Sequence, residues 1–102
     1  MKLFIDDERY PPNDGTNWTI VRSSSEAIEY VLNHGCPTFI SFDHDLGGED
    51  TAMVFLHWLI EKDMDQPGFI PAELTFAVHS QNPIGARNLK CLLEGYLLSK
   101  IM

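Results

Sequence analysis

The sequence has few basic residues for its size. Seven lysines and arginines face fifteen aspartates and glutamates, which leaves a formal net charge of -8 at pH 7. Proteins that bind nucleic acid along its backbone need clustered basic side chains to displace counterions. We therefore expect no extended nucleic-acid binding surface, although contact with a single terminal phosphate is compatible with this composition.

Cysteines and long apolar runs are also scarce. Cys36 and Cys91 have no closely spaced partner, which argues against a disulfide framework and against a zinc site. No apolar run approaches the roughly 18 residues that a membrane-spanning helix needs, and the opening segment MKLFIDDER turns acidic too early for a secretory leader. We expect a cytoplasmic protein that does not bind membranes, folded as a single domain over residues 1–102.

Four short segments that are rich in apolar and β-branched residues predict β-strands. Each is bounded by turn-forming residues, prolines or acidic pairs. The predicted strands cover residues 3–5, 18–21, 38–42 and 74–78.

Amphipathic segments follow three of these strands and predict helices. Ser23 and Glu26 match a capping box at the start of the first helix, and Gly35 is placed to end it. The second helix is expected to start near residue 50 or 51, and its apolar stripe runs to about residue 62.

The third helix is predicted to begin with Asn82 as its N-cap and Pro83 at its first position. Alternating strands and helices indicate an α/β sandwich around a short, mostly parallel, four-stranded sheet. The link between the first two strands is too short for a full crossover helix, and the strand order is left open.

Acidic and polar side chains follow three of the predicted strands. Parallel strands bring their carboxyl ends to one crevice, so we expect these side chains to share one rim of the sheet. They are Asp6, Asp7, Asp43, His44, Asp45, His79 and Ser80.

Asp6, Asp7 and Asp43 are the predicted metal ligands. Clustered carboxylates repel one another unless a cation or a bound proton neutralises them. Hard oxygen ligands that are open to solvent suit Mg²⁺ or Mn²⁺ better than zinc, and such an ion favours a phosphate as its further ligand. The alternative is that these aspartates are solvated turn formers.

His44 and His79 are candidates for proton transfer, because the imidazole group titrates near neutrality. Asp45 is expected to orient a water molecule or His79. The alternative for both histidines is that they only hydrogen-bond loop carbonyl groups and take no part in chemistry.

Five residues are predicted to hold a phosphate. Ser80 and Asn82 bring polar groups and free N–H groups to the start of a helix. All three arginines follow strands on the predicted rim, and a guanidinium group grips phosphate as a planar fork. They are Arg9, Arg22 and Arg87. Their alternative role is to neutralise the acidic cluster.

Three motifs carry a resemblance to a known family. They are Asp6-Asp7-Glu8-Arg9 with Pro11-Pro12, Asp43-His44-Asp45-Leu46-Gly47, and His79-Ser80 with Asn82-Pro83 and Gly85. Together they resemble the cyclic-phosphate processing receiver domain, a divergent group of receiver domains of the response-regulator type. The resemblance implies a flavodoxin-like fold, a metal-binding acidic pocket and action on a cyclic phosphate in RNA repair or nucleotide processing.

Two features differ from a phosphorelay receiver. We expect a sheet truncated before a fifth strand, without the lysine that a receiver carries there, and no full helix after the first strand. Phosphotransfer to Asp43 is therefore the third and weakest hypothesis.

The leading hypothesis is metal-dependent hydrolysis of a cyclic phosphate on a nucleotide or an RNA end. In it Asp43, His44, Asp45 and His79 take catalytic roles, and Mg²⁺ or Mn²⁺ is the cofactor. The alternative is a non-catalytic, receiver-like module that binds a phosphorylated ligand or a protein partner.

Overall fold

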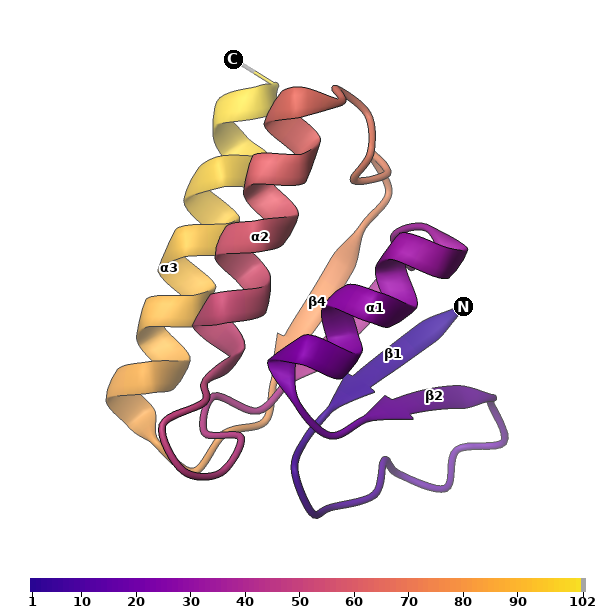
Figure 1. Ribbon diagram of the computed structural model, residues 1–102, viewed down its shortest axis with the longest axis vertical. Helices are drawn as coiled ribbons and strands as arrows, with labels where there is room; N and C mark the ends of the chain where they lie inside the picture. Colours follow the sequence, from indigo (N-terminus) through magenta and orange to yellow (C-terminus); the bar gives the residue numbers. More distant parts are fainter. Residues whose placement is uncertain (102) are drawn as a thin grey trace.

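The computed structural model describes residues 1–101, so the last residue of the predicted domain lies outside the described part. Two strands come first along the chain, and helices and strands then alternate (Figure 1). The elements are β1 (Lys2–Ile5), β2 (Trp18–Val21), α1 (Ser24–His34), β3 (Phe39–Phe42), α2 (Ala52–Asp65), β4 (Thr75–Val78) and α3 (Pro83–Lys100). No helix within residues 1–101 combines the length and the apolar character needed to cross a membrane.

The four strands found within residues 1–101 form one parallel sheet in the order β2-β1-β3-β4. Leu3 of β1 is in register with Thr19 and with Ile40, and Ile40 is in register with Phe76. The prediction of an α/β, flavodoxin-like fold with a parallel sheet is confirmed. Because β1 and β3 are neighbours, the loops that follow them leave the sheet side by side.

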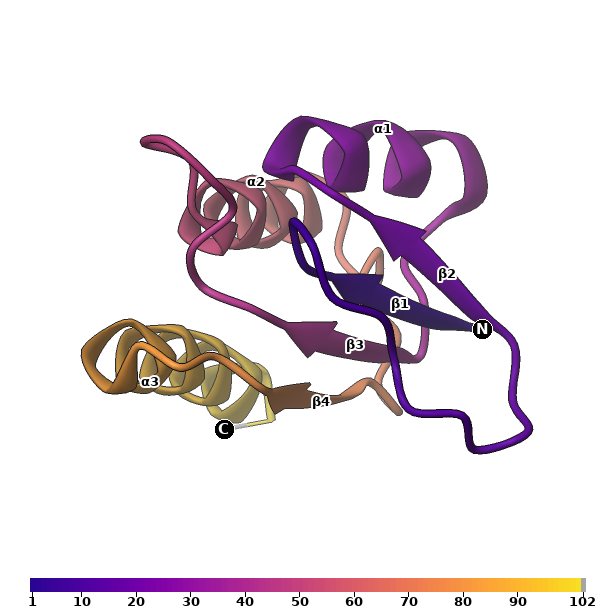
Figure 2. The same ribbon diagram turned by 90° about the horizontal axis from the view of Figure 1, so that it is seen from below.

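The helices of residues 1–101 all pack on one face of the sheet (Figure 2). Both α1 and α2 link parallel strands in the same direction along the sheet, and right-handed crossovers then place them on the same side. Leu3, Ile40 and Phe42 are buried on this side, where the Phe42 ring lies 6.3 Å from the ring of Phe55 in α2. On the opposite face, residues 6–17 run along the sheet without forming a helix, in agreement with the prediction for this short link (Figure 2).

The helix caps are largely those that the sequence predicts. The Ser23 hydroxyl accepts a hydrogen bond from the backbone N–H of Glu26 at 3.1 Å, and the Asn82 side chain accepts one from Gly85 at 2.9 Å. The second half of the predicted capping box is wrong, because the Glu26 carboxylate accepts from the N–H of Arg22 and not from that of Ser23. This contact ties the residue after β2 to the first turn of α1.

Candidate active site

Three carboxylates meet where β1 and β3 end. Asp6 and Asp7 follow β1, and Asp43 follows β3. One oxygen atom from each lies within 4.8 Å of an oxygen atom of the other two. The structure therefore brings together the three residues that the sequence singles out as metal ligands.

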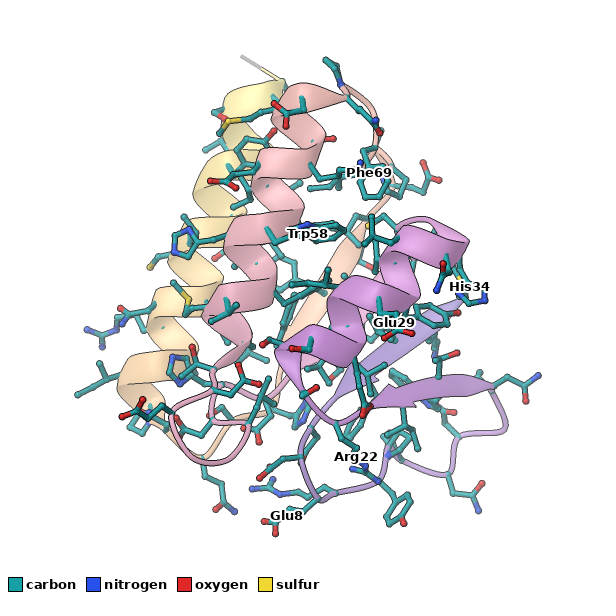
Figure 3. The ribbon with its side chains drawn as sticks, in the orientation of Figure 1. Glu8, Arg22, Glu29, His34, Trp58 and Phe69 are labelled. Atoms are coloured by element: carbon teal, nitrogen blue, oxygen red, sulfur yellow. The ribbon has the colours of Figure 1, made fainter. Side chains whose placement is uncertain are left out.

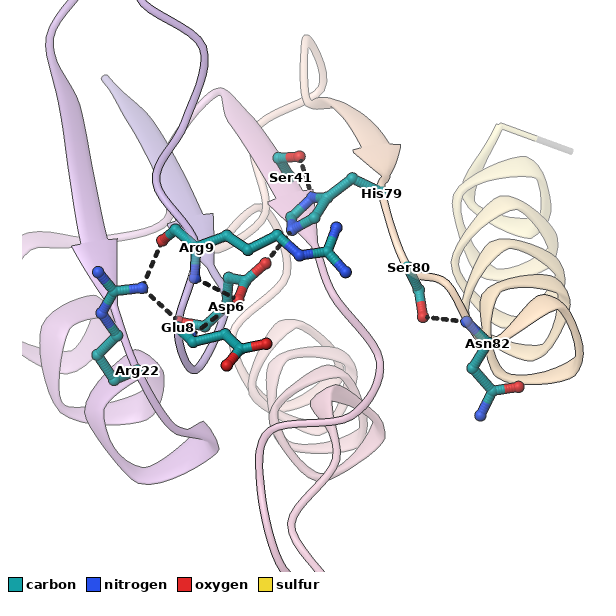
Figure 4. A network of polar contacts seen from close by, with 8 residues as sticks. All are labelled: Asp6, Glu8, Arg9, Arg22, Ser41, His79, Ser80 and Asn82. Atoms are coloured by element: carbon teal, nitrogen blue, oxygen red, sulfur yellow. Dashed lines mark hydrogen bonds and ion pairs between the residues drawn. The ribbon is translucent and has the colours of Figure 1, made fainter.

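Asp6 is fully buried, and both of its carboxylate oxygens accept hydrogen bonds. Its Oδ1 accepts from the backbone N–H groups of Glu8 and Arg9, each at 2.9 Å, and its Oδ2 lies 3.0 Å from Nε2 of His79 (Figure 4). Burial alone would raise the pKa of Asp6, but the N–H groups of Arg9 and Glu8 and the His79 ring together hold the pKa below its ordinary value of 3.8. Asp6 is thus a carboxylate that the protein keeps ionised.

His79 lies behind Asp6. Because a carboxylate only accepts hydrogen bonds, Nε2 carries the proton, and in the neutral ring Nδ1 then accepts from the Ser41 hydroxyl at 2.7 Å (Figure 4). The ring also stacks on Phe4, with ring centroids 4.5 Å apart and planes within 4° of parallel. Both nitrogens and one face of His79 therefore have protein partners, and this ring fixes the orientation of the Asp6 carboxylate.

The pKa of Asp43 is shifted in the opposite direction. Its side chain is buried, which raises its pKa above 3.8, and the nearby Asp6 carboxylate raises it further. The His79 ring, the Ser80 hydroxyl and Arg9 offset part of this rise. No ion pair within residues 1–101 involves Asp43.

The donor set fits a hard divalent cation. Asp7 is exposed, and no hydrogen bond from residues 1–101 reaches its carboxylate. Asp6 keeps a free lone pair on Oδ2, and Asp43 is a buried carboxylate without a cationic partner in the same part of the chain. A few carboxylate oxygens that leave room for water or phosphate ligands suit Mg²⁺ or Mn²⁺.

A pocket of about 510 Å³ opens beside the three carboxylates. Its lining residues come from the loops after β1, β3 and β4. They are Asp7, Glu8, Arg9, Asp43, Asp45, Gly47, Gly48, Ser80, Gln81 and Asn82. Six of these residues are among those that the sequence predicts for the site, and they bring acidic, basic and hydroxyl groups to one cavity.

His44 and His79 do not belong to this lining. Nδ1 of His44 lies 3.0 Å from Oδ1 of Asp45, and the Asn82 amide donates to the other Asp45 oxygen at 3.3 Å. These two partners lower the pKa of Asp45, His44 more strongly than Asn82. Asp45 is therefore an ionised carboxylate on the pocket wall, and its partner His44 lies outside the pocket lining. The predicted proton transfer by the two histidines stays a prediction.

The His44 ring depends on a glycine in α3. A Cβ atom at Gly85 would lie 2.6 Å from Nδ1 of His44, whereas a Cβ atom at Gly95 of the same helix would meet nothing within 4 Å. Gly85 is therefore needed for the close approach of α3 to the loop after β3, and Gly95 is not.

We expect Gly85→Ala to lower the free energy of unfolding by about 1–3 kcal/mol, the usual cost of overpacking. Gly95→Ala is the matched control and should raise it by about 0.5–1 kcal/mol, because Ala favours a helix interior. Urea unfolding of the two variants measures both effects. If Gly85→Ala were as stable as Gly95→Ala, the packing of His44 against α3 would be contradicted.

The loop after β3 is held in place at both ends. Gly47 has a φ of 92°, a conformation that strongly favours glycine, and it lies next to the Asp7 carboxylate, where a Cβ would be in ordinary van der Waals contact with Oδ2 at 3.5 Å. Farther along, the Asp50 carboxylate accepts hydrogen bonds from the backbone N–H and the hydroxyl of Ser24 in α1. The loop thus joins the acidic cluster to the start of α1.

The three arginines occupy different places. Arg9 lines the pocket and lies close enough to Asp43 to lower its pKa. Nη1 of Arg22 donates instead to the backbone carbonyl groups of Asp6 and Arg9, outside the pocket lining (Figure 4). Arg87 is exposed on α3, also outside the lining. The structure therefore brings Arg9 to the acidic cluster, whereas Arg22 braces the loop that carries it.

Three residues that contribute side chains to the site were not among the predicted residues. Glu8 and Gln81 line the pocket, and Ser41 holds His79. Ser41 carried a usable signal, because it is the one polar residue in the apolar strand Phe39–Phe42. Glu8 lies within the first motif, so only Gln81 had no distinguishing pattern.

Comparisons with known proteins agree with the motifs. A family model described as the cyclic-phosphate processing receiver domain matches residues 1–95. No significant match was found among curated proteins or among solved structures. All three motifs lie inside the matched residues, so the resemblance drawn from them is confirmed.

Proposed function

Because this chain belongs to the cyclic-phosphate processing receiver domain family, we propose that it hydrolyses a cyclic phosphate at the end of a nucleotide or an RNA. The proposed cofactor is Mg²⁺ or Mn²⁺, held by Asp6, Asp7 and Asp43. The observation that carries the proposal is the meeting of these three carboxylates, two of which, Asp7 and Asp43, line a pocket that also presents Arg9 and Ser80.

A divalent cation at this position would polarise the phosphoryl oxygens and stabilise the charge that develops on them. Arg9 supplies a planar cation on the pocket wall, suited to a second phosphoryl oxygen. The Ser80 hydroxyl accepts the N–H of Asn82 at 3.0 Å and also lowers the pKa of Asp43 through a side-chain hydrogen bond. Its proton would turn from Asp43 to a phosphoryl oxygen when the phosphate binds.

Hydrolysis requires a base for the attacking water. Asp45 is on the pocket wall and its pKa is lowered, so it is ionised and able to accept that proton. The water oxygen forms a bond to phosphorus while its proton passes to Asp45, one of the two ring P–O bonds breaks, and the departing alkoxide oxygen takes up that proton from Asp45. The product is a phosphomonoester. His44 orients Asp45 and His79 orients Asp6 in this scheme.

A second candidate is a module that binds a phosphorylated ligand or a protein partner without catalysis. It is favoured by the position of the two imidazoles, since neither lines the pocket and both nitrogens of His79 have protein partners. For the same reason the hydrolysis scheme above assigns proton transfer within the pocket to a carboxylate.

Asp7→Asn separates the two candidates. We expect wild-type protein with Mg²⁺ or Mn²⁺ to convert adenosine 2′,3′-cyclic phosphate to a monophosphate, and ³¹P NMR measures this conversion. In Asp7→Asn we expect kcat/KM to fall by about 100-fold or more, because the variant lacks a ligand of the proposed metal. Asp14→Asn is the matched control, an exposed aspartate paired with Lys2 at 3.5 Å. Binding without turnover by wild-type protein would support the module instead.

A further inference from the structure

Tyr10 is an unusual side chain at the edge of the site. It directly follows Arg9 of the pocket wall, and its side chain is 76% exposed. It is the only aromatic residue among the exposed large hydrophobic side chains of residues 1–101. Its ring lies over the guanidinium group of Arg22, with 4.8 Å between Cζ and the ring centroid.

Arg22 is itself fixed by the loop that holds the acidic cluster. Its Nη1 donates to the carbonyl oxygen of Asp6 at 3.0 Å and to that of Arg9, and its backbone N–H donates to the Glu26 carboxylate. Arg22 lies at the same end of the molecule as Glu8 of the pocket lining (Figure 3). One guanidinium group thus joins the backbone of a predicted metal ligand to the underside of the Tyr10 ring.

We propose that Tyr10 is the platform on which a nucleobase of the substrate stacks. This inference rests on the proposed function and deepens it, because it selects a base-bearing cyclic phosphate over a small alkyl one. Stacking on an aromatic face is available to every base and does not require sequence recognition. Arg22 covers one face of the Tyr10 ring, and the Pro11-Pro12 pair that follows Tyr10 restricts the backbone. Both features limit the orientations of the ring, whose other face is available for stacking.

The pocket offers no aromatic surface for a base. None of its lining residues is aromatic, and the net charge of -8 provides little attraction for a polynucleotide backbone. Affinity for a nucleotide beyond its cyclic phosphate must then come from outside the pocket, and Tyr10 is the exposed aromatic residue joined to it.

The test compares two substrates that share a five-membered cyclic phosphate. Adenosine 2′,3′-cyclic phosphate carries a base, and glycerol 1,2-cyclic phosphate does not. We expect wild-type protein with Mg²⁺ to prefer the adenosine compound, and Tyr10→Ala to lower the ratio of the two kcat/KM values by about 5- to 150-fold, mainly through the KM of the adenosine compound. Tyr10→Phe should keep the ratio within about twofold, and Leu32→Ala, at an exposed position of α1, is the control.

The same comparison is made by calorimetric binding, so that it does not depend on turnover. If both compounds bind without hydrolysis and Tyr10→Ala still removes the preference for adenosine, the stacking platform holds and the hydrolase proposal fails. If hydrolysis occurs but the ratio is unchanged in Tyr10→Ala, the platform is overturned and the hydrolase stands. Failure of wild-type protein to bind either compound overturns both. A dinucleotide that ends in a 2′,3′-cyclic phosphate is then compared with the mononucleotide. Tighter binding of the dinucleotide that is lost in Tyr10→Ala indicates an RNA end, and equal affinities indicate a free nucleotide.

Discussion

Asp43→Asn is expected to abolish the stabilisation of this protein by Mg²⁺ or Mn²⁺. A ligand that binds only the folded state at 100 times its Kd stabilises it by about 2.7 kcal/mol. For a chain of 102 residues this corresponds to a rise in Tm of about 10–20 °C. The asparagine removes one charged oxygen ligand of three, so the variant should show almost no shift when the metal is titrated in differential scanning fluorimetry.

The same variant is expected to be more stable than wild-type protein when no metal is present. Burial and the Asp6 carboxylate raise the pKa of Asp43, so its ionised form is disfavoured in the folded state. Such a group contributes stability that is present below its unfolded pKa and is lost as the pH rises through its folded pKa. At neutral pH a neutral amide avoids this penalty, and the gain should disappear as the pH falls towards 4.

Asp45→Asn is the comparison for Asp43→Asn. The pKa of Asp45 is lowered, and its carboxylate is not part of the three-residue cluster. The Asp45→Asn variant should therefore keep the metal-dependent rise in Tm. Equal loss of the metal response in the two variants would contradict the assignment of the cluster, and an unstable metal-free Asp43→Asn would contradict the electrostatic argument.

The fold was predictable because each element had a local signal. The strand boundaries lie within one residue of their predicted positions, and the caps at Ser23 and Asn82 are as expected. The acidic cluster was predictable because parallel strands end at the same edge of the sheet. The strand order was left open, and the pairing of β1 with β3 is what brings Asp6 and Asp43 together.

The roles of individual side chains were harder to predict, because direction and competition for partners are tertiary properties. Arg22 follows a strand, like Arg9, yet its guanidinium satisfies two backbone carbonyl groups and supports Tyr10. His79 follows β4 at the predicted rim, yet Ser41 and Asp6 engage both of its nitrogens. Placement at the end of a strand identifies the region of a site, but hydrogen-bond partners decide what each side chain can do there.

Asp6 and Asp7 are adjacent in the sequence and contribute to the same cluster, but replacing each by alanine should have different effects. We expect Asp6→Ala to lower the free energy of unfolding by about 3–5 kcal/mol. It leaves the N–H groups of Glu8 and Arg9 without their acceptor and removes the partner of His79 inside the protein. Asp7→Ala should change stability by less than about 0.5 kcal/mol, because no hydrogen bond from residues 1–101 reaches that exposed carboxylate.

Urea unfolding without metal measures this contrast, and a metal titration of each folded variant completes it. Small domains are stable by only about 5–15 kcal/mol, so Asp6→Ala will be close to unfolding at 37 °C and is best studied at lower temperature. Asp6→Asn retains an acceptor oxygen for the two N–H groups and should recover part of the lost stability without recovering the metal response. If Asp6→Ala were as stable as Asp7→Ala, the buried hydrogen bonds of Asp6 could not be what holds the loop after β1. The carboxylates would then be equivalent ligands on a loop supported by Arg22, and Arg22→Ala would become the more destabilising substitution.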